Sequence, residues 1–487
     1  MIHPRKILII GGGLSGLAAA YRLQELGNAE KQDIKIKVEV LEAGPHLGGL
    51  LHTESRDGFL LESGAESFLA DKPWAWDLCR RLGIENELIQ TNPACRRSFI
   101  AMKNRLHPIP KGFYLMAPRD LGALWRTPLL SWRGKLRMAA ELFIPRKMDS
   151  SDESVAAFIR RRLGDEALER LGQPLIGGIY AADPELLSLQ ATFPQFLEME
   201  HLYGSVIRGL RTVEPGKTGA IAKASGPRYS LFMSFRHGMG RLIEALAGAL
   251  PPGTCHTQSP VVRIAHENIW RVYLENGEVH EADAVVLALP AYRAAKMVRD
   301  LSSLLTEHLR AIPYESAATV HLAFRRAAIG HPLNGFGFVV PASEELAMTG
   351  CTFSSIKFEG RAPDADTVLL RAFIGGPSHR ALLRWEDAEV AEAVVLQLRS
   401  LLDLSEEPQW VQVHRFERAM PQYRVGHLAR VRRIETEAAE FPGLYLTGNA
   451  FHGVGIPDCI YQAESVAERV MVDLKTCPFL LPAGARP

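Results

Sequence analysis

The stretch from residue 6 to residue 20 constrains the fold more than any other part of the chain. An apolar run at 7–10 leads into a glycine loop with the spacing Gly-x-Gly-x-x-Gly, and an alanine-rich run follows. Strand, glycine loop and helix in this order are typical of the phosphate-binding start of a dinucleotide fold. Gly11 would permit the tight turn, Gly13 would leave room for a pyrophosphate, and Gly16 would let the helix pack closely on the strand. We therefore predict an α/β fold with a Rossmann-like FAD/NAD(P)-binding domain.

A second signal favours FAD over a nicotinamide cofactor. Residues 36–41 predict a second strand, which ends at Glu42. The Glu42 carboxylate would accept hydrogen bonds from a ribose diol and would repel a 2′-phosphate. The glycine pair Gly48 and Gly49 follows within a few residues, and such a pair after the acidic residue is typical of FAD proteins. We therefore predict FAD as the cofactor.

Bulk composition excludes several classes of protein. The chain has 487 residues, a length that predicts more than one domain. Its net charge of +1 argues against nucleic-acid binding. The six cysteines contain no Cys-x-x-Cys pair, which predicts reduced thiols, no metal site and a cytoplasmic protein. Because the first predicted strand starts so near residue 1, we expect no signal peptide.

The order of signals along the chain predicts three parts. Dinucleotide signals lie near both ends, so we predict a discontinuous FAD-binding domain made of residues 1–90, 215–299 and 430–475. Strand-like segments at 318–324, 335–340 and 367–373 and a helical segment at 388–402 indicate an α+β layer. We assign this substrate-binding domain to 91–114, 201–214 and 300–429. A mainly helical subdomain is expected at 115–200.

One stretch of the chain is strongly basic. Twelve Lys or Arg residues lie between Arg96 and Lys147, and only Asp120 and Glu141 oppose them. Aromatic and aliphatic residues alternate with these cations, as in segments that lie on an anionic membrane surface. The stretch could equally attract a carboxylated substrate, or form the solvated basic face of a helical subdomain. All three interpretations stay open at this point.

The C-terminal part carries a more specific pattern. Residues 443–460 read Gly-Leu-Tyr-Leu-Thr-Gly-Asn-Ala-Phe-His-Gly-Val-Gly-Ile-Pro-Asp-Cys-Ile, and residues 178–184 read Gly-Ile-Tyr-Ala-Ala-Asp-Pro. With the segment Gly-Ala-Glu-Ser-Phe at 64–68, these stretches resemble the oxygen-dependent protoporphyrinogen/coproporphyrinogen oxidases. That family lies within the amine-oxidase-like flavoproteins, and the similarity runs nearly end to end.

The resemblance implies an activity in heme biosynthesis. A porphyrinogen, either protoporphyrinogen IX or coproporphyrinogen III, would lose three hydrides to flavin N5, with O2 as acceptor and H2O2 released. The flavin would carry the chemistry, so no catalytic side chain is assigned. The resemblance allows a homodimer and a peripheral position on the inner face of the cell membrane. Two alternatives are a flavin amine oxidase on the same fold and a flavin-binding assembly protein without catalysis.

The resemblance also implies a substrate site. Val339, Thr352 and Phe373 would line a flat slot, and Thr352 departs from the leucine common in relatives, which would make that wall smaller and more polar. The carbonyl of Gly178 would accept hydrogen bonds from pyrrole N–H groups. The family's usual arginine falls at Ser98, so a one-residue shift would place Arg97 against a propionate; the alternative is a surface charge.

Glycines in the C-terminal loop would let backbone N–H groups approach the flavin. The helix that follows would direct its positive end toward the isoalloxazine. Motifs and resemblance together predict the following cofactor-binding residues: Gly11, Gly13, Leu14, Ser15, Gly16, Glu42, Ala43, Gly48, Gly49, Gly64, Ala65, Glu66, Val262, Gly448, Asn449, Val454, Gly455 and Ile456.

Overall fold

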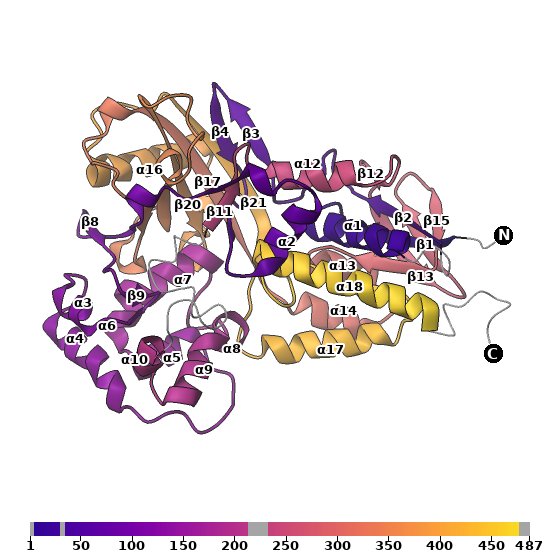
Figure 1. Ribbon diagram of the computed structural model, residues 1–487, viewed down its shortest axis with the longest axis horizontal. Helices are drawn as coiled ribbons and strands as arrows, with labels where there is room; N and C mark the ends of the chain where they lie inside the picture. The colour runs from indigo at the N-terminus through magenta and orange to yellow at the C-terminus, as the bar shows by residue number, and fades with distance from the viewer. Residues whose placement is uncertain (1–3, 30–34, 213–231, 477–487) are drawn as a thin grey trace.

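The structure is a computed structural model that describes residues 4–29, 35–212 and 232–476. Figure 1 divides the molecule into two halves. The first and last helices, α1 (Leu14–Ala29) and α18 (Ile456–Thr476), lie side by side in one half. The other half holds a large sheet and, below it in this view, a group of short helices.

Five parallel strands form the sheet of the first half, in the order β12–β2–β1–β16–β22. These strands are β1 (Arg5–Ile10), β2 (Ile36–Leu41), β12 (Cys255–His256), β16 (Ala284–Leu287) and β22 (Leu444–Leu446). They come from the N-terminal, middle and C-terminal parts of the chain. This arrangement confirms the α/β class and the discontinuous Rossmann-like domain.

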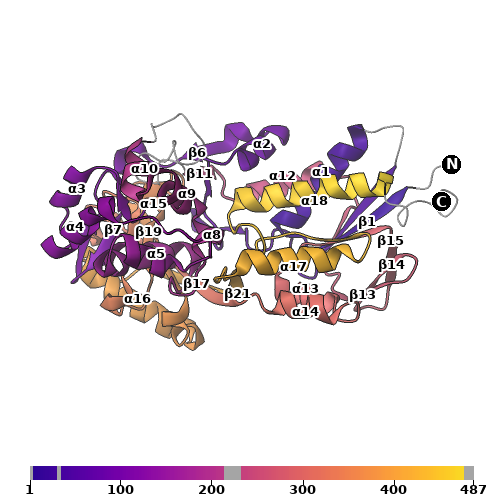
Figure 2. The ribbon, with the colours of Figure 1, turned by 90° about the horizontal axis from the view of Figure 1, so that it is seen from below.

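Both faces of this sheet are covered, because neighbouring residues of β1 point in opposite directions. Ile7 and Ile9 pack with α1, α18 and α12 (Gly240–Ala249). Leu8 and Ile10 pack with a second layer on the other face. That layer consists of β13 (Val261–His266), β14 (Trp270–Leu274), β15 (Val279–Ala282), α13 (Ala291–Met297), α14 (Ser303–Arg310) and α17 (His427–Ala439). Figure 2 shows the two layers on either side of β1.

A seven-stranded sheet in the order β21–β17–β20–β19–β18–β7–β8 dominates the second half. Its strands are β7 (Phe99–Met102), β8 (Arg105–Pro108), β17 (Tyr314–Arg325), β18 (Gly337–Val339), β19 (Gly350–Phe353), β20 (Thr367–Gly375) and β21 (Trp410–Pro421). Helix α16 (Asp387–Leu402) covers one face, where Val394 and Leu398 join the apolar core of the sheet. The other face is turned toward the first half of the molecule.

Smaller elements connect these parts. They are β3 (Thr53–Arg56), β4 (Phe59–Glu62), β5 (Phe68–Leu69), α2 (Pro73–Arg81), β6 (Leu88–Gln90), β9 (Phe113–Tyr114), β10 (Ala117–Pro118), β11 (Phe232–Phe235) and α15 (Ser354–Lys357). The strands β3 and β4 form a hairpin, and β5, β11 and β6 form a three-stranded sheet.

The short helices share one core. They are α3 (Leu121–Arg126), α4 (Trp132–Ala139), α5 (Val155–Arg162), α6 (Asp165–Ala167), α7 (Gln173–Tyr180), α8 (Leu189–Thr192), α9 (Pro194–Tyr203) and α10 (Val206–Thr212). The predicted boundary places 201–214 with the substrate-binding sheet. Val206 and Leu210 of α10 pack with Phe196 of α9 in the helical core. The chain reverses between α9 and α10 at Gly204 (φ +69°), which keeps both helices in one layer. Residues 213 and 214 lie outside the described residues.

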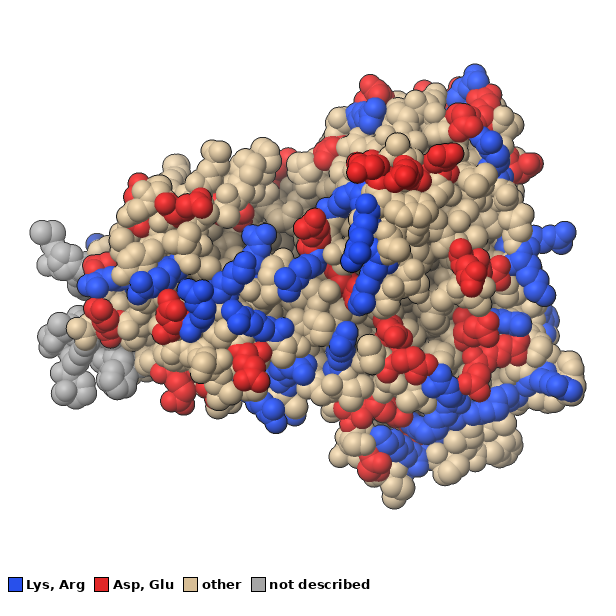
Figure 3. Space-filling model, turned by 180° about the vertical axis from the view of Figure 1, so that it is seen from behind, with Lys and Arg blue, Asp and Glu red and all other residues tan. Residues whose placement is uncertain are grey.

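The helical subdomain exposes both apolar and basic side chains. Trp132 and Phe143, within the basic stretch, are 66% and 83% exposed, and Met148, directly after it, is 85% exposed. Figure 3 shows Lys and Arg side chains gathered along the lower edge of this part of the molecule. No helix in the described ranges combines the length and the apolar character needed to cross a membrane.

A buried ion pair fastens the helical subdomain. Arg162 of α5 and Glu141 are both fully buried and hydrogen-bonded to each other. Glu141 also accepts a hydrogen bond from the Val206 N–H (2.8 Å) and one from the Ser205 hydroxyl, at the start of α10. Arg162 in turn donates to the Gly204 carbonyl (3.0 Å). The pair therefore joins α5 to the α9–α10 turn.

We expect Glu141→Ala to lower the free energy of unfolding by about 3–5 kcal/mol, because it removes the carboxylate nearest to the buried Arg162 guanidinium and leaves only Glu200, 3.5 Å away, as an acidic partner among the described residues. Denaturant unfolding measures the change. Glu406→Ala is the matched control, since the Arg325–Glu406 pair is exposed and exposed pairs contribute about 1 kcal/mol or less. Equal effects of the two substitutions would contradict this account of the pair.

Candidate functional site

The glycine loop after β1 has the geometry of a phosphate cradle. Gly11 has φ +108°, and a Cβ on it would lie 2.4 Å from the Ala288 carbonyl oxygen. A Cβ on Gly16 would lie 1.9 Å from the Gly11 carbonyl oxygen, so α1 and β1 touch here. Gly13 is open by contrast, because a Cβ there would find nothing nearer than the Gly49 Cα at 3.9 Å. The space at Gly13, at the positive end of α1, fits the pyrophosphate of a dinucleotide.

The second glycine pair lies beside this cradle. The Gly48 N–H donates to the Gly12 carbonyl (2.8 Å), which joins the two loops. The Glu42 carboxylate at the end of β2 accepts hydrogen bonds from the N–H groups of Gly12 and Gly44, each at 2.7 Å. Glu42 and Ala43 therefore lie at the edge of the cradle, where a ribose would follow the pyrophosphate.

The remaining predicted residues near the N-terminal loop lie in different environments. Leu14 is in the apolar core beside α18, and Ser15 is half-buried in the first turn of α1. Val262 is 50% exposed on β13, so its side chain faces solvent and a contact with a cofactor would use its backbone.

The C-terminal loop closes on the same place. Leu14 at the start of α1 and Ile456 at the start of α18 share one apolar core, so the two helices begin side by side. Gly448 has φ +130°, and a Cβ on it would meet nothing closer than 3.9 Å. The Tyr423 hydroxyl donates to the Asn449 carbonyl (2.6 Å) and accepts from the Gly453 N–H (2.9 Å), which holds the loop in place. Burial raises the pKa of Tyr423 well above its usual value, so this hydroxyl keeps its proton.

Within that loop, Val454 packs against the core of the helical subdomain, as does Val339 of β18. A Cβ on Gly455 would lie 3.0 Å from Asp458 Oδ2, so the loop and the first turn of α18 are close here. The loop that would hold the flavin therefore adjoins the predicted substrate slot.

The three predicted slot residues lie on one face of the seven-stranded sheet. The register pairs Val339 with Gly350 and Gly350 with Phe373, so these residues form one row across β18, β19 and β20. Thr352 belongs to the next row on the same face, because residues two apart in a strand share a face. All three side chains are half-buried, and α16 covers the opposite face. The structure thus brings together Val339, Thr352 and Phe373.

Two residues that the sequence analysis did not single out turn this face toward the cofactor half. Thr319 is paired with Phe373, and Arg371 with Thr352. The Thr319 hydroxyl donates to the Ser63 carbonyl (3.3 Å), and the Arg371 guanidinium donates to the same oxygen (3.0 Å). The available signal was a charged residue inside the apolar run 368–374, since an arginine there must be buried with partners.

The segment that carries Gly64 lies next to the glycine pair. A Cβ on Gly64 would lie 1.6 Å from the carbonyl oxygen of Leu50, which directly follows Gly49. Ala65 is exposed beside it. Ser63, Gly64 and Ala65 therefore lie between the phosphate cradle and the face of the seven-stranded sheet.

Glu66 has a different environment from its predicted one. Its carboxylate accepts hydrogen bonds from Lys357 Nζ (2.6 Å) and from the Ser354 hydroxyl (3.0 Å), and it is 7% exposed. Burial opposes ionisation, yet the charges of Lys357 and Arg371 hold the pKa of the Glu66 carboxyl at about 2. The side chain is thus committed to a buried ion pair with the sheet domain.

Gly178 lies near the C-terminal end of α7, where helix carbonyls lack intrahelical partners. No hydrogen bond within the described residues uses the Gly178 carbonyl, and the residue is exposed. A Cβ on Gly178 would lie 3.3 Å from Val339 Cγ1, so the helix approaches the slot directly.

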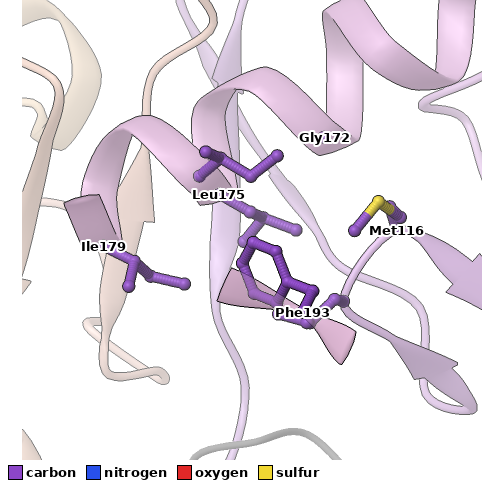
Figure 4. A pocket seen from close by; sticks show the side chains of 7 residues that line it. Met116, Gly172, Leu175, Ile179 and Phe193 are labelled. Carbon is purple, nitrogen blue, oxygen red and sulfur yellow. The ribbon is translucent and has the colours of Figure 1, made fainter. Parts of the chain in front are cut away.

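The other side of α7 borders a narrow apolar pocket. Figure 4 shows side chains from α7 and from two other segments around this pocket. It is lined by Leu115, Met116, Gly172, Leu175, Ile176, Ile179 and Phe193. None of the predicted slot residues borders it, so this pocket is separate from the slot.

Arg97 lies at the edge of the sheet face. Its carbonyl accepts a hydrogen bond from the Phe336 N–H (2.8 Å), next to β18, and the residue is exposed. Within the described residues no acidic side chain pairs with its guanidinium. Ser98, where the family's arginine would fall, is 5% exposed and turned inward.

Among the residues that the structure covers, no group of three His, Cys, Asp or Glu side chains could hold a metal ion. Cys79, Cys95, Cys255, Cys351 and Cys459 are free thiols. Cys477 lies outside the described residues.

Comparison with known proteins extends over almost the whole chain. The family model described as flavin containing amine oxidoreductase matches residues 14–471. A coproporphyrinogen III oxidase from Bacillus subtilis is 33% identical over 472 residues, which cover 96% of this chain and 98% of the relative. A chloroplastic protoporphyrinogen oxidase from Spinacia oleracea is 31% identical and covers 95% of this chain and 84% of its own. A crystal structure from Exiguobacterium sp. 255-15, described as a candidate protoporphyrinogen oxidase, superposes with a TM-score of 0.86 at 32% identity and covers 97% of this chain and 100% of its own.

The glycine loop predicts opposite outcomes for two similar substitutions. We expect Gly13→Ala to fold with a free energy of unfolding within about 0.5 kcal/mol of the original chain, because the new methyl enters open space. The same methyl would obstruct the pyrophosphate and weaken FAD binding at least tenfold. Gly16→Ala should instead lower the unfolding free energy by about 1–3 kcal/mol, because its methyl would overlap the Gly11 carbonyl.

Isothermal titration of the apoprotein with FAD and denaturant unfolding measure both effects. Tight FAD binding by Gly13→Ala, with no loss of affinity, would contradict the placement of the pyrophosphate.

Proposed function

This chain belongs to the flavin containing amine oxidoreductases, and from this membership we propose that it is an FAD-dependent porphyrinogen oxidase of heme biosynthesis. The flavin predicted from the glycine loops is confirmed by the family. The relatives named above are porphyrinogen oxidases, and they align with this chain over nearly its full length.

One observation carries the proposal: a single sheet face holds the slot residues and is hydrogen-bonded to the cofactor half. Val339 and Phe373 lie in one row of that face, and Thr319 of the same row donates to Ser63. A flat macrocycle that lay on this face would have the cofactor segment 63–65 at its side.

Bound FAD would supply the redox chemistry, taking hydride from the macrocycle and passing electrons to O2 with release of H2O2. The residues of this chain bind and orient the substrate. Phe373 offers a ring for stacking on a pyrrole. The Arg371 guanidinium lies 4.8 Å from the centroid of this ring and restricts its position. Val339 and Thr352 form the rest of the wall, and Thr352 leaves room that leucine would fill.

Two polar groups complete the slot. The carbonyl of Gly178, which has no partner in the described part of the chain, would accept hydrogen bonds from pyrrole N–H groups. These groups would otherwise stay unsatisfied in an apolar slot. The Arg97 guanidinium, which pairs with no acidic side chain among the described residues, would bind a propionate at the edge of the sheet.

We propose coproporphyrinogen III as the preferred substrate. It carries two more propionates than protoporphyrinogen IX, and the exposed cations of the basic stretch would attract the more anionic macrocycle. The alignment with a coproporphyrinogen III oxidase, 33% identical over 96% of this chain, supports the same choice.

The purified chain with FAD should convert coproporphyrinogen III to fluorescent porphyrin, with uptake of O2. We expect a higher kcat/KM for coproporphyrinogen III than for protoporphyrinogen IX, measured in parallel in steady state. A preference for protoporphyrinogen IX would contradict the substrate choice, and absence of O2 uptake with both would contradict the oxidase.

Arg97→Ala should raise KM for coproporphyrinogen III about 10-fold to 100-fold with little change in kcat. This range corresponds to the loss of about 1.5–3 kcal/mol of charge-assisted hydrogen bonding. Arg96→Ala is the matched control, since its exposed neighbouring charge has no assigned contact with substrate. An unchanged KM for Arg97→Ala would remove Arg97 from the site.

We further propose that the helical subdomain contacts an anionic membrane surface. The exposed Trp132 and Phe143 lie among the cations of the basic stretch, and the exposed Met148 directly follows it. This combination suits the headgroup region of a bilayer. The alternative is that a second copy of the chain covers this surface, since the resemblance allows a homodimer.

The original chain should float with anionic vesicles at low salt and detach at high salt, because salt screens the charges. The double substitution Trp132→Ser/Phe143→Ser should abolish flotation. Leu396→Ser on α16 is the matched control, since Leu396 is 65% exposed outside the helical subdomain. Failure to float, with a dimer in size-exclusion chromatography that the double substitution dissociates, would assign the surface to a second copy instead.

A further inference from the structure

Five charged side chains are buried where the cofactor half meets the seven-stranded sheet. Glu62, Glu66, Lys357, Arg361 and Arg371, here named the buried charge cluster, are each at most 8% exposed. Burial of charge is costly unless every group is paired, so such a cluster calls for a physical account. The proposed slot and phosphate cradle do not explain it.

Cations outnumber anions in this cluster. Glu66 is ionised and paired with Lys357. Burial raises the pKa of the Glu62 carboxyl to about 7, although Arg361 lies 4.0 Å away and the Met239 N–H (2.7 Å) donates to it. Three cations therefore face one or two carboxylates, and the cluster stays positive in either protonation state of Glu62.

The neighbouring strands do not add a compensating negative charge. His321 of β17 is fully buried, and burial together with the charge of Arg371 lowers its pKa well below the usual value, so it is neutral. Burial also lowers the pKa of His414 on β21, although Glu54 opposes that shift. Glu54 is 34% exposed and lies against His414 at 3.3 Å.

Arg371 directs this positive charge at the cofactor segment. Its guanidinium donates to the carbonyls of Ser63 and Gly64. In a trans peptide the C=O and the following N–H point in opposite directions. The N–H groups of Gly64 and Ala65 therefore point away from Arg371, and neither finds an acceptor within the described residues. Both residues are at least partly exposed, so a ligand can reach these N–H groups.

We propose that Arg371 is a positioning residue that turns the Gly64 and Ala65 N–H groups toward bound FAD, and that the positive charge behind them makes the FAD easier to reduce. This inference rests on the FAD binding of the proposed function. Donors that are fixed before reaction stabilise added negative charge without reorganising, and they act more strongly where water is excluded. Both effects favour the reduced cofactor, to which electrons and negative charge have been added.

The midpoint potential of the FAD-loaded protein tests the proposal, by reduction in equilibrium with a reference dye. Arg371→Gln should change the reduction equilibrium of the flavin at least tenfold, in favour of the oxidised form. For a two-electron couple this makes the midpoint potential more negative by about 30 mV or more. Arg361→Gln is the matched control. It removes a buried charge of the same cluster, but its guanidinium contacts Ser234 and Phe235 and not the cofactor segment. The control should shift the potential less than Arg371→Gln.

An unchanged potential in FAD-loaded Arg371→Gln would overturn the proposal, and so would an equal or larger shift in Arg361→Gln. If Arg371→Gln does not fold, Arg371→Lys carries the test. One ammonium group cannot hold both carbonyls as the guanidinium fork does, so the potential should again become more negative, and an unchanged value would overturn the proposal. Failure of the original chain to bind FAD would contradict the proposed function. The shift of the midpoint potential in the FAD-loaded variants tests only the role of Arg371, so the two failures can be told apart.

Discussion

The hydrogen bonds that Thr319 and Arg371 donate to Ser63 and Gly64 are the contact on which the site depends. They fix the face of the seven-stranded sheet against the segment that runs beside the phosphate cradle. Together with the buried pair of Glu66 and Lys357, they hold the slot residues and the cofactor loops in one arrangement. Since Arg371 also lies over the Phe373 ring, one guanidinium orders both the cofactor side and the substrate side of the site.

The two halves contribute different kinds of order. In the cofactor half, order depends on glycines that lack a Cβ. Gly11 and Gly16 allow backbone contacts where a methyl group would not fit. In the sheet half, order comes from charge, because the members of the buried charge cluster pair with one another and with backbone carbonyls. Such clusters contribute little net stability, but they penalise any arrangement in which one partner is missing.

Much of the cofactor half could be predicted from the sequence, because its signals are local. The glycine spacing, the β2 strand ending at Glu42 and the second glycine pair each lie within a short window. The substrate slot required the family resemblance, since Val339, Thr352 and Phe373 come together only through strand register. Arg371 and Thr319 were missed for the same reason: their partners are more than 250 positions away in the chain. The packing of α10 on α9 after the turn at Gly204 could not be predicted, because composition alone does not reveal that reversal.

The central claim is that one FAD lies between the glycine loops and the sheet face and accepts hydride from a macrocycle lying on that face. The most direct measurement mixes the FAD-loaded protein with coproporphyrinogen III in a stopped-flow instrument under strict exclusion of O2. This account predicts rapid loss of the visible absorbance of oxidised flavin in a single turnover, at a rate that saturates with substrate concentration. A bound flavin that dithionite reduces but that coproporphyrinogen III and protoporphyrinogen IX both leave oxidised would contradict it.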